Sequence, residues 1–544
     1  MSTSIKKKYD GFLSLMLHAH LPFVRHPETS YMMEENWLFE AITETYLPLF
    51  SIFDQCLYDG IPLRLTISLT PTLCSMLNDD LLKERYLNYL KRLEELAEKE
   101  VDRTKSKKVY HSTACMYRDK FSVCRYLFEK KCDGNILEGF RKFQENGLLE
   151  IITCGATHGF LPTMQHNPNA VYAQIAVAVA SHQNFFGTAP KGIWLPECGY
   201  YPGLETILER AGIKYFFTET HGVLFADPPP QYGVYAPVYC KEAPVAAFGR
   251  DAESSRAVWS AQEGYPGDPA YRDFYRDIGF DLDIDYIKPY IDPIGIRINT
   301  GIKYYRITGD TLRKKPYNRE HALRTAVLHA GNFMFNREQQ AKYLSSVMDR
   351  PPIIVAPYDA ELFGHWWYEG PEWLNFLIRK ITFEQSTIGL VTPSDYLKTF
   401  PENQICKPSF SSWGEGGYSD VWLNESNNWV YRHLHQMESK MVDAARAFAD
   451  PPDALSRRAL NQMARELLLA ESSDWAFIMK TGTMVNYAVR RTKEHIANFL
   501  RLHNDLQNGS IDHNYVSLLE SHNNIFPDLD YTVYAQELEL PVSS

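Results

Sequence analysis

Short apolar runs that end in polar residues recur through the N-terminal three quarters of the chain. Parallel strands that are buried on both faces have this continuous apolar character, whereas half-exposed strands alternate apolar and polar positions. We therefore predict buried parallel strands at Phe12–His20, Leu63–Leu69, Leu149–Thr153, Gly192–Glu197, Tyr215–Glu219, Val245–Phe248 and Ile353–Asp359.

Helical patterns separate several of these runs. Leu204–Ala211 ends at Gly212, and Glu372–Ile381 follows Pro371. Alternating strands and helices predict an α/β fold with a parallel barrel or an open parallel sheet. The polar residues at the strand ends then lie at the edge where a parallel barrel places its chemistry.

Two long segments interrupt this alternation. In the first, at about 72–148, Lys, Arg and Glu lie at helical spacing around Leu and Tyr, which predicts a charged helical insertion with a solvated face. The second, at about 221–304, is rich in Pro, Asp, Tyr and Gly, and we predict a long loop region there. Loops of that length in a compact enzyme are usually functional.

The last part of the chain has a different pattern of apolar and polar residues. After Pro408 the pattern shows long helical periods, for example Asn428–Asp450 and Asp453–Ala470, without strand signals. We therefore predict a catalytic barrel-type domain over 1–408 and an α-helical C-terminal domain over 409–544.

Composition narrows the class of protein. The 544 residues are 45% hydrophobic and 23% charged, which is typical of a globular enzyme. The net charge of −11 comes without a long basic block, so nucleic acid is not expected as a partner. No apolar stretch reaches the roughly 18 residues that a membrane span needs, so no membrane partner is expected either.

Cysteine usage and the N-terminus bear on location. The nine cysteines are an odd number without C-x-x-C spacing, and we expect reduced thiols in a cytoplasmic protein. The apolar run Gly11–Leu17 is broken by His18 and His20 and has no small-residue cleavage site, so we interpret it as a first strand and not a signal peptide.

His18 and His20 point to the same face of that strand, because strand side chains repeat with period two. Two interpretations remain open from the spacing. The pair ligates a metal, with His158, His221, His329 or His365 as further candidates, or it hydrogen-bonds a substrate in a metal-free pocket.

Two carboxylates lie at separate strand ends. Glu197 ends the run Trp194–Glu197, where it is either a rigid nucleophile exposed to a pocket or a carboxylate at a helix N-terminus. Asp359 ends another strand among aromatic residues, and apolar surroundings raise a carboxyl pKa and suit a proton donor. Such a pair is what glycosyl transfer through a covalent intermediate requires, with carboxyl groups roughly 5 to 7 Å apart.

Several motifs, in order, resemble the signature regions of the family 57 glycoside hydrolases. They are His18-x-His20-x-Pro22, Gly155–Gly159, Trp194–Glu197, Tyr358–Trp367, Ser411–Gly414 and Ser472–Trp475. The resemblance spans most of the chain. It implies an incomplete (β/α)7 barrel, a helical C-terminal domain that closes the cleft, and retaining chemistry on α-glucans.

The resemblance also implies roles for individual residues. Glu197 matches the family's nucleophile and Asp359 its general acid/base, and catalysis needs neither a metal nor another cofactor. His18 and His20 then become sugar-contact residues. Further substrate-binding residues on this reading are His158, Tyr232, Trp259, Trp366, Trp413, Trp422 and Asp474.

The chain is most similar to those family members that cleave an α-1,4 bond and transfer the chain to a 6-hydroxyl. In these members tryptophans line the acceptor groove, which Trp259, Trp413 and Trp422 match, and a mobile loop carries a tyrosine, which Tyr232 matches. The implied partner is an α-glucan such as amylose, amylopectin or glycogen. The expected assembly is a monomer or a small homo-oligomer.

Three alternatives stay open. The same scaffold serves α-amylases and 4-α-glucanotransferases, which differ in product linkage. A metal-dependent barrel hydrolase would use His18 and His20 as ligands. A glucan-binding protein with an inactive site is the third, although both carboxylates are present.

Overall fold

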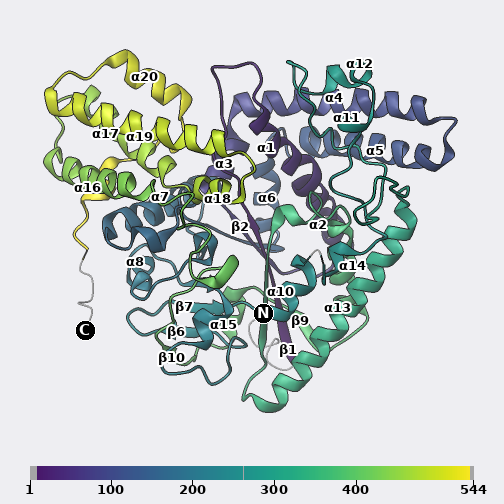
Figure 1. Cartoon of the computed structure of the whole chain (residues 1–544). Helices are drawn as coiled ribbons and strands as arrows, with labels where there is room; N and C mark the ends of the chain where they lie inside the picture. Colours follow the sequence, from purple (N-terminus) through teal and green to yellow (C-terminus); the bar gives the residue numbers. More distant parts are fainter. Residues whose placement is uncertain (1–8, 261, 539–544) are drawn as a thin grey trace.

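The computed structural model describes residues 9–260 and 262–538, and its centre is a curved parallel sheet (Figure 1). The strands follow the order β8–β1–β2–β3, a bridge between Thr153 and Ile193 joins β3 to β4, and β4–β5–β7 continue the sheet. The bounds are β1 Gly11–Ala19, β2 Leu65–Leu69, β3 Leu149–Ile152, β4 Gly192–Trp194, β5 Tyr215–Thr218, β7 Ala246–Gly249 and β8 Ile353–Asp359. Each overlaps a predicted run, and the incomplete (β/α)7 barrel is confirmed.

Strand β1 shows how the sequence builds this sheet. Phe12 and Met16 pack inside the barrel, while Leu13, Leu15 and Leu17 pack against the surrounding helices. Both faces are buried, which is why the run is apolar throughout. The period of two places His18 on the interior face at the C-terminal end of the strand.

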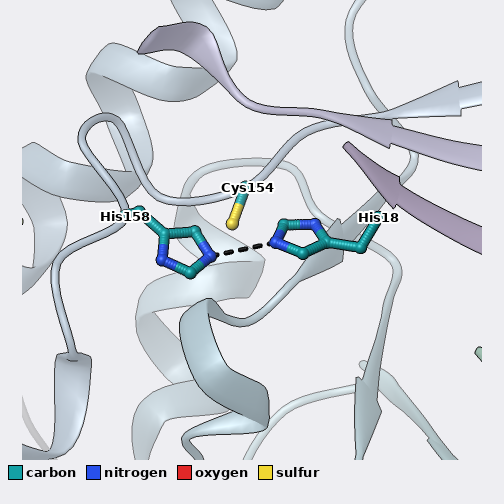
Figure 2. A group of neighbouring side chains, drawn as sticks. All are labelled: His18, Cys154 and His158. Atoms are coloured by element: carbon teal, nitrogen blue, oxygen red, sulfur yellow. Dashed lines mark hydrogen bonds between the residues drawn. The ribbon is translucent and has the colours of Figure 1, made fainter. Parts of the chain in front are cut away.

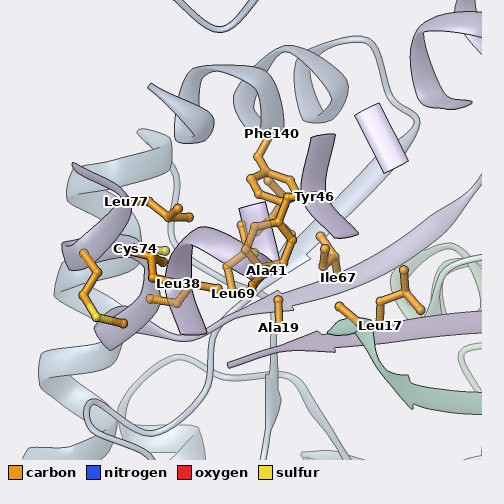
Figure 3. Packing of buried hydrophobic residues seen from close by; sticks show 14 of the residues in the cluster. Leu17, Ala19, Leu38, Ala41, Tyr46, Ile67, Leu69, Cys74, Leu77 and Phe140 are labelled. Atoms are coloured by element: carbon orange, nitrogen blue, oxygen red, sulfur yellow. The ribbon is translucent and has the colours of Figure 1, made fainter. Parts of the chain in front are cut away.

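Helices cover the outer face of β1 and β2 (Figure 3). The helices in contact come from α1 (Asn36–Ala41), α3 (Pro71–Asn78), α6 (Ile136–Glu145) and the helical turn Ile42–Tyr46. The residues in this layer are Leu17, Ala19, Leu38, Ala41, Tyr46, Ile67, Leu69, Cys74, Leu77 and Phe140, all nearly inaccessible to solvent. This close packing fixes the strand ends that carry the polar residues.

Three short strands were not predicted. β9 (Ile388–Leu390) pairs with the start of β1, β6 (Val238–Cys240) runs antiparallel to β7, and β10 (Ile405–Cys406) pairs with β6. Runs of two or three residues carry too little periodicity to be recognised in a sequence.

The segment at 72–148 is helical, as predicted. It comprises α3, α4 (Asp80–Thr104), α5 (Lys108–Tyr126) and α6, and the long pair α4 and α5 lies side by side at the upper right of Figure 1. The Asp79 side chain caps α4 by accepting a hydrogen bond from Leu82 N.

The remaining helices of the barrel part alternate with its strands. The segment at 221–304, predicted as a long loop region, also holds β6, β7 and short helices, and the long helix α13 that follows it was not predicted. The remaining helices of the whole barrel part have the bounds α2 (Leu47–Tyr58), α7 (Pro168–Phe186), α8 (Leu204–Arg210), α9 (Thr220–Leu224), α10 (Ala252–Trp259), α11 (Ile278–Asp281), α12 (Ile284–Ile287), α13 (Arg319–Val347), α14 (Gly370–Phe383) and α15 (Pro393–Thr399).

The C-terminal region is helical, which confirms the fold prediction. Its helices lie together at the upper left of Figure 1, and α17 packs along α19. Their bounds are α16 Tyr431–Ala447, α17 Ala454–Ala470, α18 Ser473–Thr481, α19 Val485–Asn508 and α20 His513–His522. The domain limits at 408 and 409 stay a prediction. Over the described residues, none of the helices combines the length and apolar character that crossing a bilayer requires.

Candidate active site

Glu197 stands just beyond the C-terminal end of β4, in the turn η6 (Pro196–Cys198). Its backbone has φ +60° and ψ 25°, and Cys198 also has positive φ. Non-glycine residues rarely adopt this left-handed conformation, which costs of order 1 to 3 kcal/mol and persists where the surroundings fix it. The backbone N–H of Trp413 donates to Glu197 O over 2.9 Å and helps to hold the turn.

The Glu197 carboxylate is buried and has two strong donors. Ser473 Oγ donates to Oε1 over 2.7 Å, and Trp413 Nε1 donates to Oε2 over 2.8 Å. His158 Nδ1 lies 3.5 Å from Oε1. Burial raises the pKa of Glu197, and the hydrogen bonds from Trp413 and Ser473 act against that rise. The two donors therefore favour the ionised form of Glu197 and oppose the effect of burial.

Asp359 ends β8 directly beside His18 in the strand register. Burial raises the pKa of Asp359 well above its ordinary value, and the charges of Glu361 and Glu197 add to the rise while Arg250 opposes it. A raised pKa favours the protonated form that a proton donor needs. The predicted separation of the Glu197 and Asp359 carboxyl groups stays a prediction.

His18 and His158 form a buried pair (Figure 2). Their Nε2 atoms lie 3.0 Å apart, and Cys154 lies beside them. The second nitrogen of His18 lies 3.3 Å from Ser68 Oγ, and that of His158 lies 2.8 Å from Ser473 Oγ. Burial lowers the pKa of both imidazoles well below the ordinary value, so both are neutral at pH 7. Ser473 thus connects the imidazole pair to Glu197.

His20 and Asp474 form an ion pair between the end of β1 and α18. His20 Nε2 lies 3.0 Å from each carboxylate oxygen of Asp474, and His20 Nδ1 lies 3.1 Å from Thr70 Oγ1. Burial lowers the pKa of His20, but the Asp474 carboxylate and further acidic groups outweigh it and the pKa is raised. The imidazolium lies close enough to Glu197 to lower its pKa.

Two groups in this region have the composition of a metal site. One is His18, Cys154 and His158, and the other is His20, His158 and Asp474. All imidazole nitrogens of these three histidines have a hydrogen-bond partner within the protein. Burial raises the pKa of Cys154 well above its ordinary value, which favours the thiol over the thiolate. In this structure the three histidines are held in hydrogen-bonded networks.

The tryptophans that were predicted to bind substrate differ in their exposure to solvent. Trp259 is 37% exposed and its ring lies edge-on to Trp413 at 6.1 Å between centroids. Trp366 is 53% exposed and stacks on Phe274 at 4.2 Å. Trp422 is only 1% exposed and stacks on Phe160. Trp422 offers no face to a ligand here, and it supports the layer beneath Trp413.

Tyr232, which the resemblance implied as a substrate-binding residue on a mobile loop, lies away from the carboxylates in this structure. The Tyr232 ring lies 6.0 Å from the Arg350 guanidinium, and Tyr235 O accepts a hydrogen bond from the backbone of Ile353, the first residue of β8. Asp359 lies at the other end of this strand, roughly 20 Å away for seven residues. The loop therefore packs at the N-terminal end of the barrel, opposite the carboxylates.

Sequence reasoning missed three residues around the carboxylates. Ser473 lies in a recognised motif but was not singled out, Glu361 follows Asp359 by two positions, and Arg250 follows the run that forms β7. Arg250 Nη1 lies 2.9 Å from Glu219 Oε2, and both residues stand just beyond strand ends. The position of Arg250 just after a buried strand is the signal that could have found it.

Comparison with known proteins agrees with this arrangement. The family model described as glycosyl hydrolase family 57 matches residues 14–409. The chain belongs to glycoside hydrolase family 57. A second model, described as the C-terminal domain of 1,4-alpha-glucan branching enzyme, matches residues 433–534. The first match therefore covers the barrel, and the second covers most of the C-terminal helices.

The proteins to which this chain is similar carry two different names. The chain is 33% identical to a 1,4-alpha-glucan branching enzyme of Thermococcus kodakarensis, over 97% of this chain and 79% of that protein. The structure of the alpha-amylase AmyC from Thermotoga maritima matches with a TM-score of 0.91 at 48% identity, over 97% of this chain and all of AmyC. A branching enzyme from Pyrococcus horikoshii matches with a TM-score of 0.87 at 32% identity, over 98% of both chains.

Proposed function

We propose that this family 57 protein is a 1,4-α-glucan branching enzyme. The observation that carries the choice is the match of residues 433–534 to the C-terminal domain of branching enzymes. This region supplies Ser473 and Asp474 to the site, so it is part of the catalytic arrangement. The similarity to named branching enzymes over nearly the whole chain supports the same choice.

In the first step Glu197 acts as the nucleophile. Its carboxylate attacks C1 of a glucosyl unit, the α-1,4 bond breaks, and Asp359 gives its proton to the departing 4-oxygen. The donor chain is then held on Glu197 as a β-linked ester. The hydrogen bonds from Trp413 and Ser473 favour the ionised form of Glu197 that attacks, and the raised pKa of Asp359 favours the protonated form that gives the proton.

In the second step an acceptor glucan replaces the leaving chain. Asp359, now ionised, takes the proton of a 6-hydroxyl, the 6-oxygen attacks C1, and the ester to Glu197 breaks. Two inversions at C1 retain the α configuration, and the product is an α-1,6 branch in a glycogen-like glucan. Trp259, exposed beside Trp413, is suited to stack on the acceptor and to exclude water.

The role of Glu197 is tested by replacement and rescue. Glu197→Gln should leave the fold intact and remove nearly all turnover, because an amide does not form the ester. In Glu197→Gly, azide should restore cleavage and give a glycosyl azide of β configuration, since azide enters where the carboxylate stood. An α-configured azide, or turnover retained in Glu197→Gln, would overturn the assignment.

An α-amylase is the second candidate. The 48% identity to the α-amylase AmyC favours it, and so does the position of Tyr232 away from the carboxylates, because that tyrosine was one of the features that pointed to transfer. Water would then attack the glycosyl ester in place of a 6-hydroxyl. The two candidates share Glu197 and Asp359 and differ only in the second step.

The remaining parts of the proposal concern metal, assembly and location. We expect full activity after treatment with a chelator, because the carboxylate pair supplies nucleophile and proton donor without a Lewis acid. Loss of activity in chelator would favour the metal-dependent hydrolase.

We also propose that the protein is a monomer or a small homo-oligomer and that it is located in the cytoplasm. The nine free cysteines support that location.

A further inference from the structure

We propose a divalent metal site, suited to Zn²⁺, formed by His166, His435 and Glu438 where the barrel meets the C-terminal helices. His166 lies between the turn η5 (Leu161–Met164) and α7, while His435 and Glu438 lie on α16. The possible ligand atoms of the three residues all lie within 4.8 Å of one another. This cluster is separate from the carboxylates of the active site.

One pair of side chains in the cluster has the ligand spacing of zinc. His166 Nε2 lies 3.2 Å from Glu438 Oε2, and the rings of His166 and His435 are 3.9 Å apart between centroids. Ligands of a tetrahedral zinc ion with bonds near 2.05 Å lie roughly 3.3 Å from one another. His435 and Glu438 are three positions apart on one helix, so their side chains share a face.

The Glu438 carboxyl group gives the second, independent observation. Glu438 is fully buried, and among the described residues its Oε1 has no hydrogen-bond partner while its Oε2 has only the His166 imidazole 3.2 Å away. A buried carboxylate with so few partners is costly unless a cation compensates it.

The surroundings of the two imidazoles also suit a metal. His435 Nε2 lies 3.0 Å from Thr163 O and donates to it, which leaves the lone pair on Nδ1 for a ligand bond. The His166 side chain is 42% exposed, so ions and a water ligand can reach the cluster. Two imidazoles and one carboxylate form a set that zinc prefers, whereas Mg²⁺ and Ca²⁺ prefer oxygen ligands.

A bound metal would fasten two parts of the molecule together. The segment from His158 to His166 leads from the active site to the cluster, and α16 belongs to the C-terminal helices. Zinc would cross-link this segment to α16 and stabilise the folded protein by mass action. The main expected effect is on thermal stability, with little change in turnover at moderate temperature.

The test uses the full-length protein, stripped with a chelator and desalted, and titrated with ZnCl₂ by calorimetry. We expect one site with a Kd on the order of 1 μM or tighter, as for a three-ligand zinc site. Saturating zinc should raise the Tm by about 2 to 3 °C. Co²⁺ should give the visible absorption of a tetrahedral complex.

Variants locate the site. His435→Asn and Glu438→Gln should each weaken zinc binding at least 100-fold and remove the rise in Tm, whereas His433→Asn on the same helix should behave as the wild type. The Tm without metal checks that each variant folds, and two independent ligand variants are available. Absence of binding by the wild type, or binding unchanged in His435→Asn and Glu438→Gln, would overturn the proposal. The latter result would place the zinc at the active-site histidines.

Discussion

At the scale of residues, the charge state of Glu197 depends on two neutral donors. Ser473 Oγ and Trp413 Nε1 each donate to one carboxylate oxygen, against the effect of burial on the Glu197 pKa. Protonation of Glu197 should set the acid limb of the pH profile of kcat/KM, and loss of the Asp359 proton should set the alkaline limb. The profile is therefore expected to be bell-shaped.

The first prediction concerns Trp413→Phe, which removes the Nε1 donor. The hydrogen bond lowers the Glu197 pKa, so its loss should raise that pKa and move the acid limb of kcat/KM to higher pH. At the optimum, kcat/KM should fall roughly 10-fold, as expected for the loss of one hydrogen bond to a charged group. The measurement is the pH dependence of glucan cleavage.

Trp259→Phe is the matched control for this prediction. Trp259 packs edge-on against Trp413 and makes no hydrogen bond to Glu197. Its replacement should leave the acid limb in place. An acid limb that moves equally in both variants would show that ring packing, and not the Nε1 donor, governs the Glu197 pKa.

The sequence could locate the two carboxylates but not their donors. Glu197 and Asp359 were recognisable because each ends an apolar strand run, and strand ends meet at one edge of a barrel. Ser473 lies 276 positions from Glu197 and reaches it only through the docking of α18. No local pattern specifies that contact, so a sequence alone does not predict it.

At the scale of elements, the His20–Asp474 ion pair ties the end of β1 to α18. The second prediction is that Asp474→Asn lowers stability by about 3 kcal/mol at pH 6, because one partner of a largely buried pair is lost. Thermal unfolding of wild type and variant between pH 5 and 9 gives the measurement.

The pH dependence of this loss has a definite sign. The folded-state pKa of His20 lies above its ordinary value of 6.5, so its contribution is fully present below 6.5 and is lost as the pH rises through the folded value. The folded-state pKa of Asp474 lies below 3.8, so its contribution is lost only as the pH falls through that lower value. The difference in Tm should shrink towards pH 9, and a constant difference would contradict the ion pair.

The third prediction concerns the loop that carries Tyr232. This loop packs beside Arg350 at the N-terminal end of β8, so Tyr232→Ala should not change the ratio of α-1,6 linkages to new reducing ends. Trp259→Ala should lower that ratio, since it removes an exposed ring beside Trp413. A lower ratio in Tyr232→Ala would mean that the loop moves to the active site during turnover.

The strands β1 to β5, β7 and β8 overlap the predicted apolar runs, whereas the two- and three-residue strands β6, β9 and β10 were not predicted. β1 and β8 are apolar throughout because both faces are buried, which makes them distinct in the sequence. β10 has two residues, and one of them, Ile405, is 60% exposed. The long helix α13 was missed because its apolar residues do not form one regular stripe.

At the scale of the whole molecule, the site is complete only when the C-terminal helices meet the barrel. The barrel supplies Glu197, Asp359 and His20, while α18 supplies Ser473 and Asp474. This arrangement explains why two family models match adjacent parts of one chain. On the proposed function, the two carboxylates determine the retaining chemistry. The residues around them determine whether water or a sugar hydroxyl is the acceptor.

The fourth prediction concerns that choice of acceptor. Wild-type protein incubated with amylose should produce α-1,6 linkages that accumulate well ahead of new reducing ends. Proton NMR of the anomeric region counts the α-1,6 linkages, isoamylase digestion confirms them, and a reducing-end assay counts hydrolysis. Glu197→Gln serves as the inactive control. New reducing ends without α-1,6 linkages would contradict the account and assign the protein as an α-amylase.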